Sequence, residues 1–241
     1  MKEISVIVPF FNEEAVIVES SKRIHRYLTN NFQDFELIFV DDGSVDNSSA
    51  LIKTAIEKLP KTSLITSRVN AGRENAIKKG LTKATGKIQG YIDVDLEIGI
   101  EYLELAIKHL SRSDVVIASK FARGAKVKAP RMRKISSIFF NYFVNLALQT
   151  KVLDHQAGFK FFKKAVLDNI LSQSSQNGWL WDIEILYLSK KSQYTVIELP
   201  VEITYGYRNI RSTFLLDFLK MPFFVLSLKR TIDKKINYAK N

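Results

Sequence analysis

Short apolar runs alternate with longer amphipathic segments over the first 120 residues, and this alternation restricts the fold more than any other feature. The apolar runs occupy residues 4–11, 35–40, 61–67, 86–95 and 114–119. Segments with helical spacing of apolar residues occupy 13–30, 47–59, 73–84 and 100–110. Strands that are apolar throughout are covered on both faces, and strands that alternate with helices form parallel sheets. The sequence therefore predicts an α/β fold with a mostly parallel central sheet and helices on both faces.

The pattern changes after residue 120. The basic stretch 120–134 contains Gly124 and Pro130, so we expect a loop there. An uncharged helix is expected at 135–149, and later strands are expected within 153–162 and 195–205. The simplest division is one domain over residues 1–205, followed by a C-terminal amphipathic basic tail over 206–241.

Composition limits the partners and the metal chemistry. The 241 residues carry a formal charge of +11, which indicates an anionic partner: nucleic acid, a phosphorylated small molecule or an anionic membrane. The chain has no cysteine, so a metal would be bound by oxygen atoms or by one of three histidines. No apolar stretch reaches the ~18 residues typical of a membrane span, and the N-terminus does not resemble a signal peptide. We therefore expect a cytoplasmic protein that does not cross a bilayer.

Acidic side chains follow the apolar runs. Asp93, Asp95 and Glu97 alternate directly after the run that ends at Ile92. Ligands bind outside the carboxyl ends of strands in open α/β sheets. Mg²⁺ and Mn²⁺ prefer carboxylate and phosphate oxygens, so this pattern favours a divalent cation that holds a diphosphate. The stretch "DDGS" at 41–44 has two interpretations, a tight turn or a carboxylate that binds a ribose or a base.

Longer motifs carry a resemblance to a known family. The stretches "VIVPFFNEE", "FVDDGSVDNS", "NAGRENAIKKGLTKATG" and "YIDVDLE", in this order, resemble the motif set of glycosyltransferase family 2 on a GT-A fold. Further along, "LDHQAGFKFF", "WLWDIEIL" and "VIELPVEITYG" resemble the dolichyl-phosphate (polyprenyl-phosphate) glucosyl- and mannosyltransferases. The resemblance spans about residues 4–205. It implies a nucleotide-sugar donor, Mg²⁺ or Mn²⁺, and inverting transfer of one hexose to a polyprenyl phosphate.

The resemblance also implies roles for single residues. Those implied to border the nucleotide are Pro9, Asn12, Glu13, Asp41 and Asp42. Those implied to bind the metal are Asp95 and Glu97, together with Asp93, which faces either the ribose or the metal. Those implied to contact the acceptor phosphate or the sugar are Lys120, Arg133, Ser137, Asp154 and Gln156. The residues expected to be catalytic are Asp95, Arg133 and Asp154.

Three functions are compatible with the sequence. The first is hexose transfer from UDP-glucose or GDP-mannose to a polyprenyl phosphate, an anionic acceptor that needs no general base. The stretch "DHQAGFK" slightly favours the glucosyltransferases, and both donors stay open. The second is family 2 transfer to a saccharide or a lipid-linked oligosaccharide, which requires a base such as Asp154 or Asp182. The third is a basic module that binds nucleic acid or a membrane without catalysis. It leaves the acids at 93–97 unexplained, and no nucleic-acid motif is present, so we expect no nucleic-acid partner.

A polyprenyl phosphate acceptor requires contact with a membrane. The helix at 135–149 either packs in the core or contacts lipid. Residues 213–230 form either an interfacial helix or one that packs on its own domain or on a second subunit. The basic residues that follow could each gain ~1 kcal/mol near an anionic leaflet. We therefore expect peripheral attachment at the cytoplasmic face of a membrane.

Overall fold

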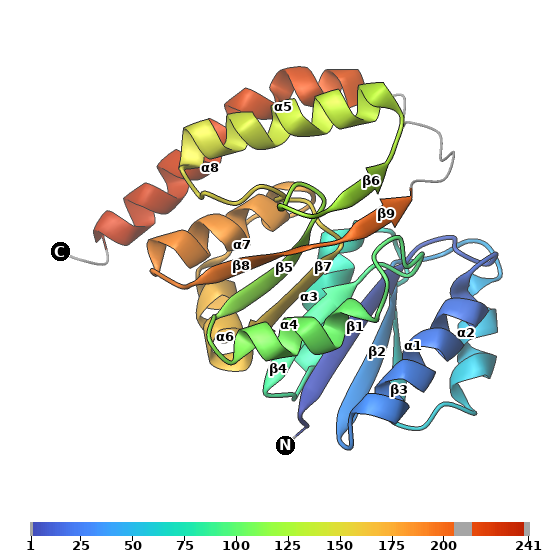
Figure 1. The fold of residues 1–241 in the computed structure, drawn as a ribbon. Coiled ribbons are helices and arrows are strands. Elements are labelled where there is room, and N and C mark those ends of the chain that lie inside the picture. Colours follow the sequence, from blue (N-terminus) through green and yellow to red (C-terminus); the bar gives the residue numbers. More distant parts are fainter. Residues whose placement is uncertain (1, 205–213, 239–241) are drawn as a thin grey trace.

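The structure is a computed structural model that describes residues 2–204 and 214–238; the side chains of Arg133 and of residues 214–219 lie outside that description (Figure 1). A seven-stranded sheet in the order β3-β2-β1-β4-β7-β5-β8 forms its centre. Its neighbouring strands are parallel except at β7, which runs antiparallel to both β4 and β5. The predicted α/β fold with a mostly parallel sheet is confirmed.

The strands begin and end close to the predicted apolar runs. Those of the main sheet are β1 (Ile4–Phe10), β2 (Phe35–Asp41), β3 (Thr62–Thr66), β4 (Ile88–Ile92), β5 (Val115–Ser119), β7 (Phe159–Lys163) and β8 (Val196–Pro200). A second, two-stranded parallel sheet joins β6 (Lys126–Lys128) to β9 (Glu202–Thr204).

Helices cover both faces of the main sheet, as predicted (Figure 1). One face carries α1 (Ile17–Asn31), α2 (Ser48–Ile56) and α4 (Tyr102–Leu110). The other carries α3 (Arg73–Lys83), α5 (Arg131–Leu148), α6 (Lys164–Gln173), α7 (Leu180–Lys191) and α8 (Phe214–Tyr238). Side chains of β1 alternate between the two cores, because Ile7 packs with α3 whereas Val6 and Val8 pack with α1.

The basic stretch 120–134 differs from the predicted loop. It contains β6, and α5 begins at Arg131 rather than at residue 135. Pro130 has φ of −55° and ψ of 141°, a conformation that ends the extended segment directly before the helix. The pairing of β6 with β9 joins residues about 75 positions apart, so local sequence patterns do not reveal it.

The C-terminal helix α8 packs on the body of the fold beside α5 (Figure 1). Its buried side chains, which belong to the same core as α5 and α7, are Met221, Val225, Leu228 and Ile232. Asp233 accepts a hydrogen bond of 2.8 Å from Tyr187 and pairs with Lys191 at 2.6 Å. The expected boundary at residue 206 lies outside the described residues. Among the helices that the structure describes, none combines the length and apolar character needed to cross a bilayer.

Candidate active site

The acidic segments meet at one edge of the sheet. Strand β1 lies between β2 and β4 and is parallel to both, so their carboxyl ends share that edge. Asp41 is in register with Phe10, and Tyr91 is in register with Ile7. Asp93, two residues beyond Tyr91, therefore lies on the same edge as Asp41, with the end of β1 between them.

Asp41 and Asp42 are buried and bind backbone amides. Asp41 accepts a hydrogen bond of 2.9 Å from the amide of Ser44, three residues further along the chain. Asp42 accepts bonds from the amides of Ala71 (3.0 Å) and Gly72 (2.7 Å), which precede α3. These two carboxylates therefore hold the loop after β2 and anchor the segment that leads into α3, while their contact with a ribose or a base stays a prediction.

The loop after β1 closes against the same turn. Asn12 accepts a hydrogen bond of 2.9 Å from the amide of Val45, and the amide of Glu13 donates to Ser48 Oγ at 2.7 Å. Pro9 is buried in β1 beside them. The residues expected to border the nucleotide are thus neighbours at this edge.

A cavity of about 580 Å³ lies next to this edge and contains most of the other predicted site residues. The predicted residues that line it are Asp93, Asp95, Glu97, Lys120, Ser137, Asp154 and Gln156. Lys134 and Ser136 of α5 add polar groups, while Val127, Ile138 and Ile203 add apolar surface. Arg133 belongs to the first turn of α5, but its side chain lies outside the described residues. One cavity therefore combines carboxylates, cations and an apolar wall.

Asp93, which is partly exposed, belongs to a network of charges whose innermost members, Asp182 and Lys160, are buried. Arg73 donates to Asp93 Oδ1 at 2.7 Å and to Asp182 Oδ2 at 3.2 Å. Asp182 Oδ1 also accepts bonds from Lys160 Nζ (2.7 Å) and from the Tyr91 hydroxyl (2.5 Å). Burial alone would raise the pKa of Asp182, but Lys160 and Arg73 outweigh it and hold that pKa below its ordinary value. For Asp93 burial is the larger effect, and its pKa is raised despite Arg73.

This network supports the floor of the cavity. Lys160, which is fully buried, also donates to the carbonyl of Ala157 at 2.7 Å. A Cβ atom added to Gly158 would lie 1.8 Å from Asp93 Oδ2, so only glycine allows this carboxylate to lie against the backbone. Sequence reasoning assigned no role to Arg73 or Lys160. A lysine within the apolar strand β7 was the available signal, because a lysine is rarely buried unless it is paired.

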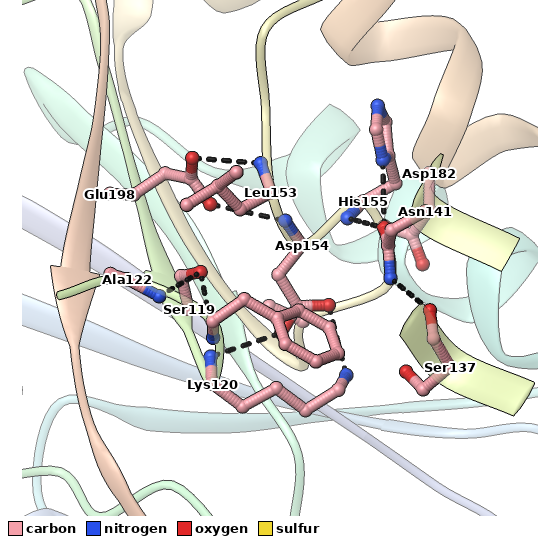
Figure 2. A network of polar contacts seen from close by, with 12 residues as sticks. Ser119, Lys120, Ala122, Ser137, Asn141, Leu153, Asp154, His155, Asp182 and Glu198 are labelled. Atoms are coloured by element: carbon pink, nitrogen blue, oxygen red, sulfur yellow. Dashed lines mark hydrogen bonds and ion pairs between the residues drawn. The ribbon is translucent and has the colours of Figure 1, made fainter. Parts of the chain in front are cut away.

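A second polar network holds Asp154 in place (Figure 2). Its carboxylate accepts bonds from Lys120 Nζ at 2.9 Å and from the Lys120 amide at 3.2 Å. Glu198 of β8 accepts hydrogen bonds from the amides of Leu153 (2.8 Å) and Asp154 (3.1 Å). Burial raises the pKa of Glu198. Asp154 is thus ion-paired and almost fully buried, and the role of Glu198 was not predicted.

The carboxylates at 93–97 fit a divalent cation that shares its coordination with a substrate. No group of three or more acidic or histidine side chains within the described part of the chain is close enough to bind an ion alone. Asp93 is already paired with Arg73. Mg²⁺ usually takes only one or two protein carboxylates together with substrate phosphates. Asp95 and Glu97, which line the cavity, can supply two carboxylates. That Asp93, Asp95 and Glu97 all bind the metal remains a prediction.

Comparison with known families identifies the chain. The sequence model described as glycosyl transferase family 2 matches residues 5–171. The chain belongs to glycosyl transferase family 2. The solved structure of glucosyl-3-phosphoglycerate synthase from Mycobacterium tuberculosis superposes on this chain with a TM-score of 0.69 at 17% sequence identity. The superposition covers 96% of this chain and 80% of that chain. This confirms the predicted family and the GT-A-type fold of the family 2 domain.

Curated relatives of this family 2 domain share between a quarter and a third of their residues with it. Dolichyl-phosphate beta-glucosyltransferase of Dictyostelium discoideum is 28% identical over 221 residues, covering 83% of this chain and 66% of the relative. Glycosyltransferase AglD of Haloferax volcanii is 27% identical over 83% of this chain and 33% of its own length. A prophage bactoprenol glucosyl transferase homolog of Escherichia coli is 28% identical over 73% of this chain and 56% of its own. The chain thus matches between one third and two thirds of each relative's length.

Proposed function

We propose that this family 2 domain transfers a hexose from UDP-glucose or GDP-mannose to a polyprenyl phosphate, with inversion at the anomeric carbon. The observation that carries the proposal is that both candidate general bases, Asp154 and Asp182, are already bound by cationic side chains. A hydroxyl acceptor needs a base within hydrogen-bond reach of its proton. A phosphate monoester is ionised at neutral pH and attacks without one.

The environment of each acid supports this argument. Asp182 accepts bonds from Arg73, Lys160 and Tyr91, and its lowered pKa makes it a poor proton acceptor. Asp154 pairs with Lys120 at 2.9 Å. His155 is buried, and burial lowers its pKa to about 3. Transfer to a saccharide or to a lipid-linked oligosaccharide is therefore the less favoured alternative.

The remaining cavity residues are assigned by their chemistry. We propose that Asp95 and Glu97 hold Mg²⁺ or Mn²⁺, with Asp93 beside them; when bound, such a cation stabilises charge on the leaving diphosphate as a Lewis acid. Lys120 attracts the anionic groups of donor and acceptor. The other residues proposed to bind the acceptor phosphate or the sugar are Arg133, Ser137 and Gln156. The residues proposed to border the nucleotide are Pro9, Asn12, Glu13, Asp41 and Asp42.

The names of the relatives support the same choice of substrates. They include transferases named for dolichyl phosphate and for bactoprenol, and each of these is named as a glucosyltransferase. The solved structure from Mycobacterium tuberculosis contains Mn²⁺ and uridine diphosphate. UDP-glucose is therefore the first donor to test.

We further propose peripheral attachment to a membrane through the outer faces of α5 and α8. The large apolar side chains exposed there are Met132, Ile135, Ile138, Phe139, Tyr142, Leu146, Phe223, Phe224 and Leu226. Basic residues flank them, including Arg131, Lys134, Lys151 and Lys220. An apolar surface bordered by cations fits an anionic lipid surface. Ile138 also lines the cavity, which links this surface to the site.

Charge placed on this surface is expected to weaken membrane binding. The double change Ile135→Glu and Leu146→Glu should lower binding to vesicles with anionic lipids by about tenfold or more, because it removes apolar contact and repels anionic headgroups. Sedimentation with vesicles measures the bound fraction. The matched control is Leu51→Glu with Leu105→Glu, two exposed leucines on α2 and α4. Equal binding of both double variants and the wild type would exclude this surface as the attachment site.

Radiolabelled donors test the proposed reaction. The protein is incubated with UDP-glucose or GDP-mannose, with and without polyprenyl phosphate and with Mg²⁺ or EDTA. We expect a chloroform-soluble labelled product that requires the polyprenyl phosphate and is lost with EDTA. Label that enters only water-soluble saccharide would support the alternative function instead.

A further inference from the structure

Helix α5 and the segment 153–158 form two walls of the cavity. The residues of α5 that line it are Lys134, Ser136, Ser137, Ile138 and Phe140. Those of the segment are Asp154, Gln156, Ala157 and Gly158. Under the proposed function the first wall carries the acceptor phosphate and the second carries the donor sugar. The reaction then depends on the spacing between the two walls.

One buried pair of side chains joins these walls (Figure 2). Asn141 Oδ1 of α5 accepts two hydrogen bonds from His155, from its amide at 2.9 Å and from its ring Nδ1 at 2.8 Å. Asn141 Nδ2 donates to the carbonyl of Ser137 at 2.9 Å, which fixes the orientation of the amide group. Asn141 is 5% exposed and His155 is fully buried.

The remaining ring nitrogen of His155 also has a polar neighbour. Because Asn141 Oδ1 can only accept, the proton of the neutral ring lies on Nδ1. Nε2 lies 2.8 Å from Thr150 Oγ1, whose one proton can be donated either to Nε2 or to Asn145 Oδ1 at 2.9 Å. With Nδ1 bonded to Asn141 and Nε2 beside Thr150, the imidazole has one orientation, so it holds the segment in one place relative to α5.

We propose that Asn141 and His155 are positioning residues that set the spacing between the acceptor wall and the sugar wall of the cavity. This inference rests on the proposed function, and it adds two residues that contact no reacting atom. His155 lies between Asp154, which pairs with Lys120, and Gln156, which lines the cavity. A shift of His155 therefore moves both Asp154 and Gln156.

The effect of losing this pair should be local. Glu198 still binds the amides of Leu153 and Asp154, so the start of the segment stays attached to β8. Asn12 and Asp42, at the nucleotide edge, bond to other loops. Binding of the nucleotide should therefore survive a change that misplaces the sugar relative to the acceptor.

Kinetics with three variants and one control variant test the proposal. Asn141→Leu and His155→Leu should lower kcat/KM for polyprenyl phosphate by about 10- to 100-fold, the cost of misplacing reacting groups by about 1 Å. The affinity for UDP with Mg²⁺, measured by calorimetry, should stay within about twofold of the wild type, as expected where a change spares a separate binding region. His155→Asn keeps a short side-chain amide near the position of Nδ1 and should recover most of the loss. Asn169→Leu, an exposed asparagine of α6, is the matched control.

Two kinetic results would overturn the positioning role. One is unchanged kcat/KM in Asn141→Leu, and the other is a loss of UDP affinity as large as the loss in kcat/KM. Hydrogen exchange of the His155 amide gives a readout that needs no activity, and it should accelerate in Asn141→Leu while amides of β1 stay protected. If the wild type transfers no sugar to polyprenyl phosphate, the proposed function fails, and unchanged exchange in the variant would separately overturn the positioning role.

Discussion

Replacing Asp95 with asparagine is expected to lower sugar transfer by ~100- to 1000-fold, the usual cost of losing one electrostatic contact to the transition state. Asp95 lines the cavity beside Glu97, where we propose that both hold the divalent cation. The asparagine has nearly the same shape but lacks the charge that a hard cation prefers. Turnover with UDP-glucose at saturating Mg²⁺ measures the effect, and electron paramagnetic resonance measures the affinity for Mn²⁺.

Glu57→Gln is the matched control for this change, because Glu57 is an exposed carboxylate at the end of α2. It should retain full turnover and Mn²⁺ affinity. Both variants should unfold at the wild-type temperature. Retained turnover together with unchanged Mn²⁺ affinity in Asp95→Asn would remove Asp95 from the metal site.

The variant Asp182→Ala is expected to lose about 3–5 kcal/mol of unfolding free energy, the usual cost of removing one partner of a buried ion pair. Asp182 is the common acceptor of bonds from Lys160, Arg73 and Tyr91. Lys160 is fully buried and would keep a charge with no carboxylate beside it. Denaturation in urea, followed by circular dichroism, measures the loss.

Asp168→Ala provides the comparison, because Asp168 pairs with Lys164 on the exposed surface of α6 at 2.9 Å. That change should alter stability by less than about 1 kcal/mol. Asp182→Asn, which keeps the shape and one acceptor oxygen, should fall between the two. If Asp182→Ala were as stable as Asp168→Ala, the network beneath the cavity would not contribute to stability.

Much of the fold follows from local patterns in the sequence. Apolar runs define β1, β2 and β5 to within about a residue or two at each end, the usual scatter between ways of assigning element ends. Parallel strands also place their carboxyl ends together, so Asp41 and Asp93 could be assigned to one edge without any structure. The cavity then brings together Asp95, Lys120 and Gln156 from three separate motifs.

Other features depend on contacts between distant residues. Arg73 and Asp182 are 109 positions apart, and neither motif indicates that they meet. Strand β6 forms only because β9 provides its partner. Asn141 is one of several polar residues on α5, and its role becomes visible only where α5 passes over His155. Tertiary contacts, rather than local propensity, decide such features.

Under the proposed function, the acceptor must carry its own negative charge. The most direct test compares initial rates for polyprenyl phosphate and for the matching polyprenol, at one concentration of UDP-glucose and Mg²⁺. We expect transfer to the phosphate and transfer at least ~100-fold slower to the alcohol, because the two candidate bases, Asp154 and Asp182, are both ion-paired. Equal rates, or faster transfer to the alcohol or to a saccharide, would contradict the proposed function.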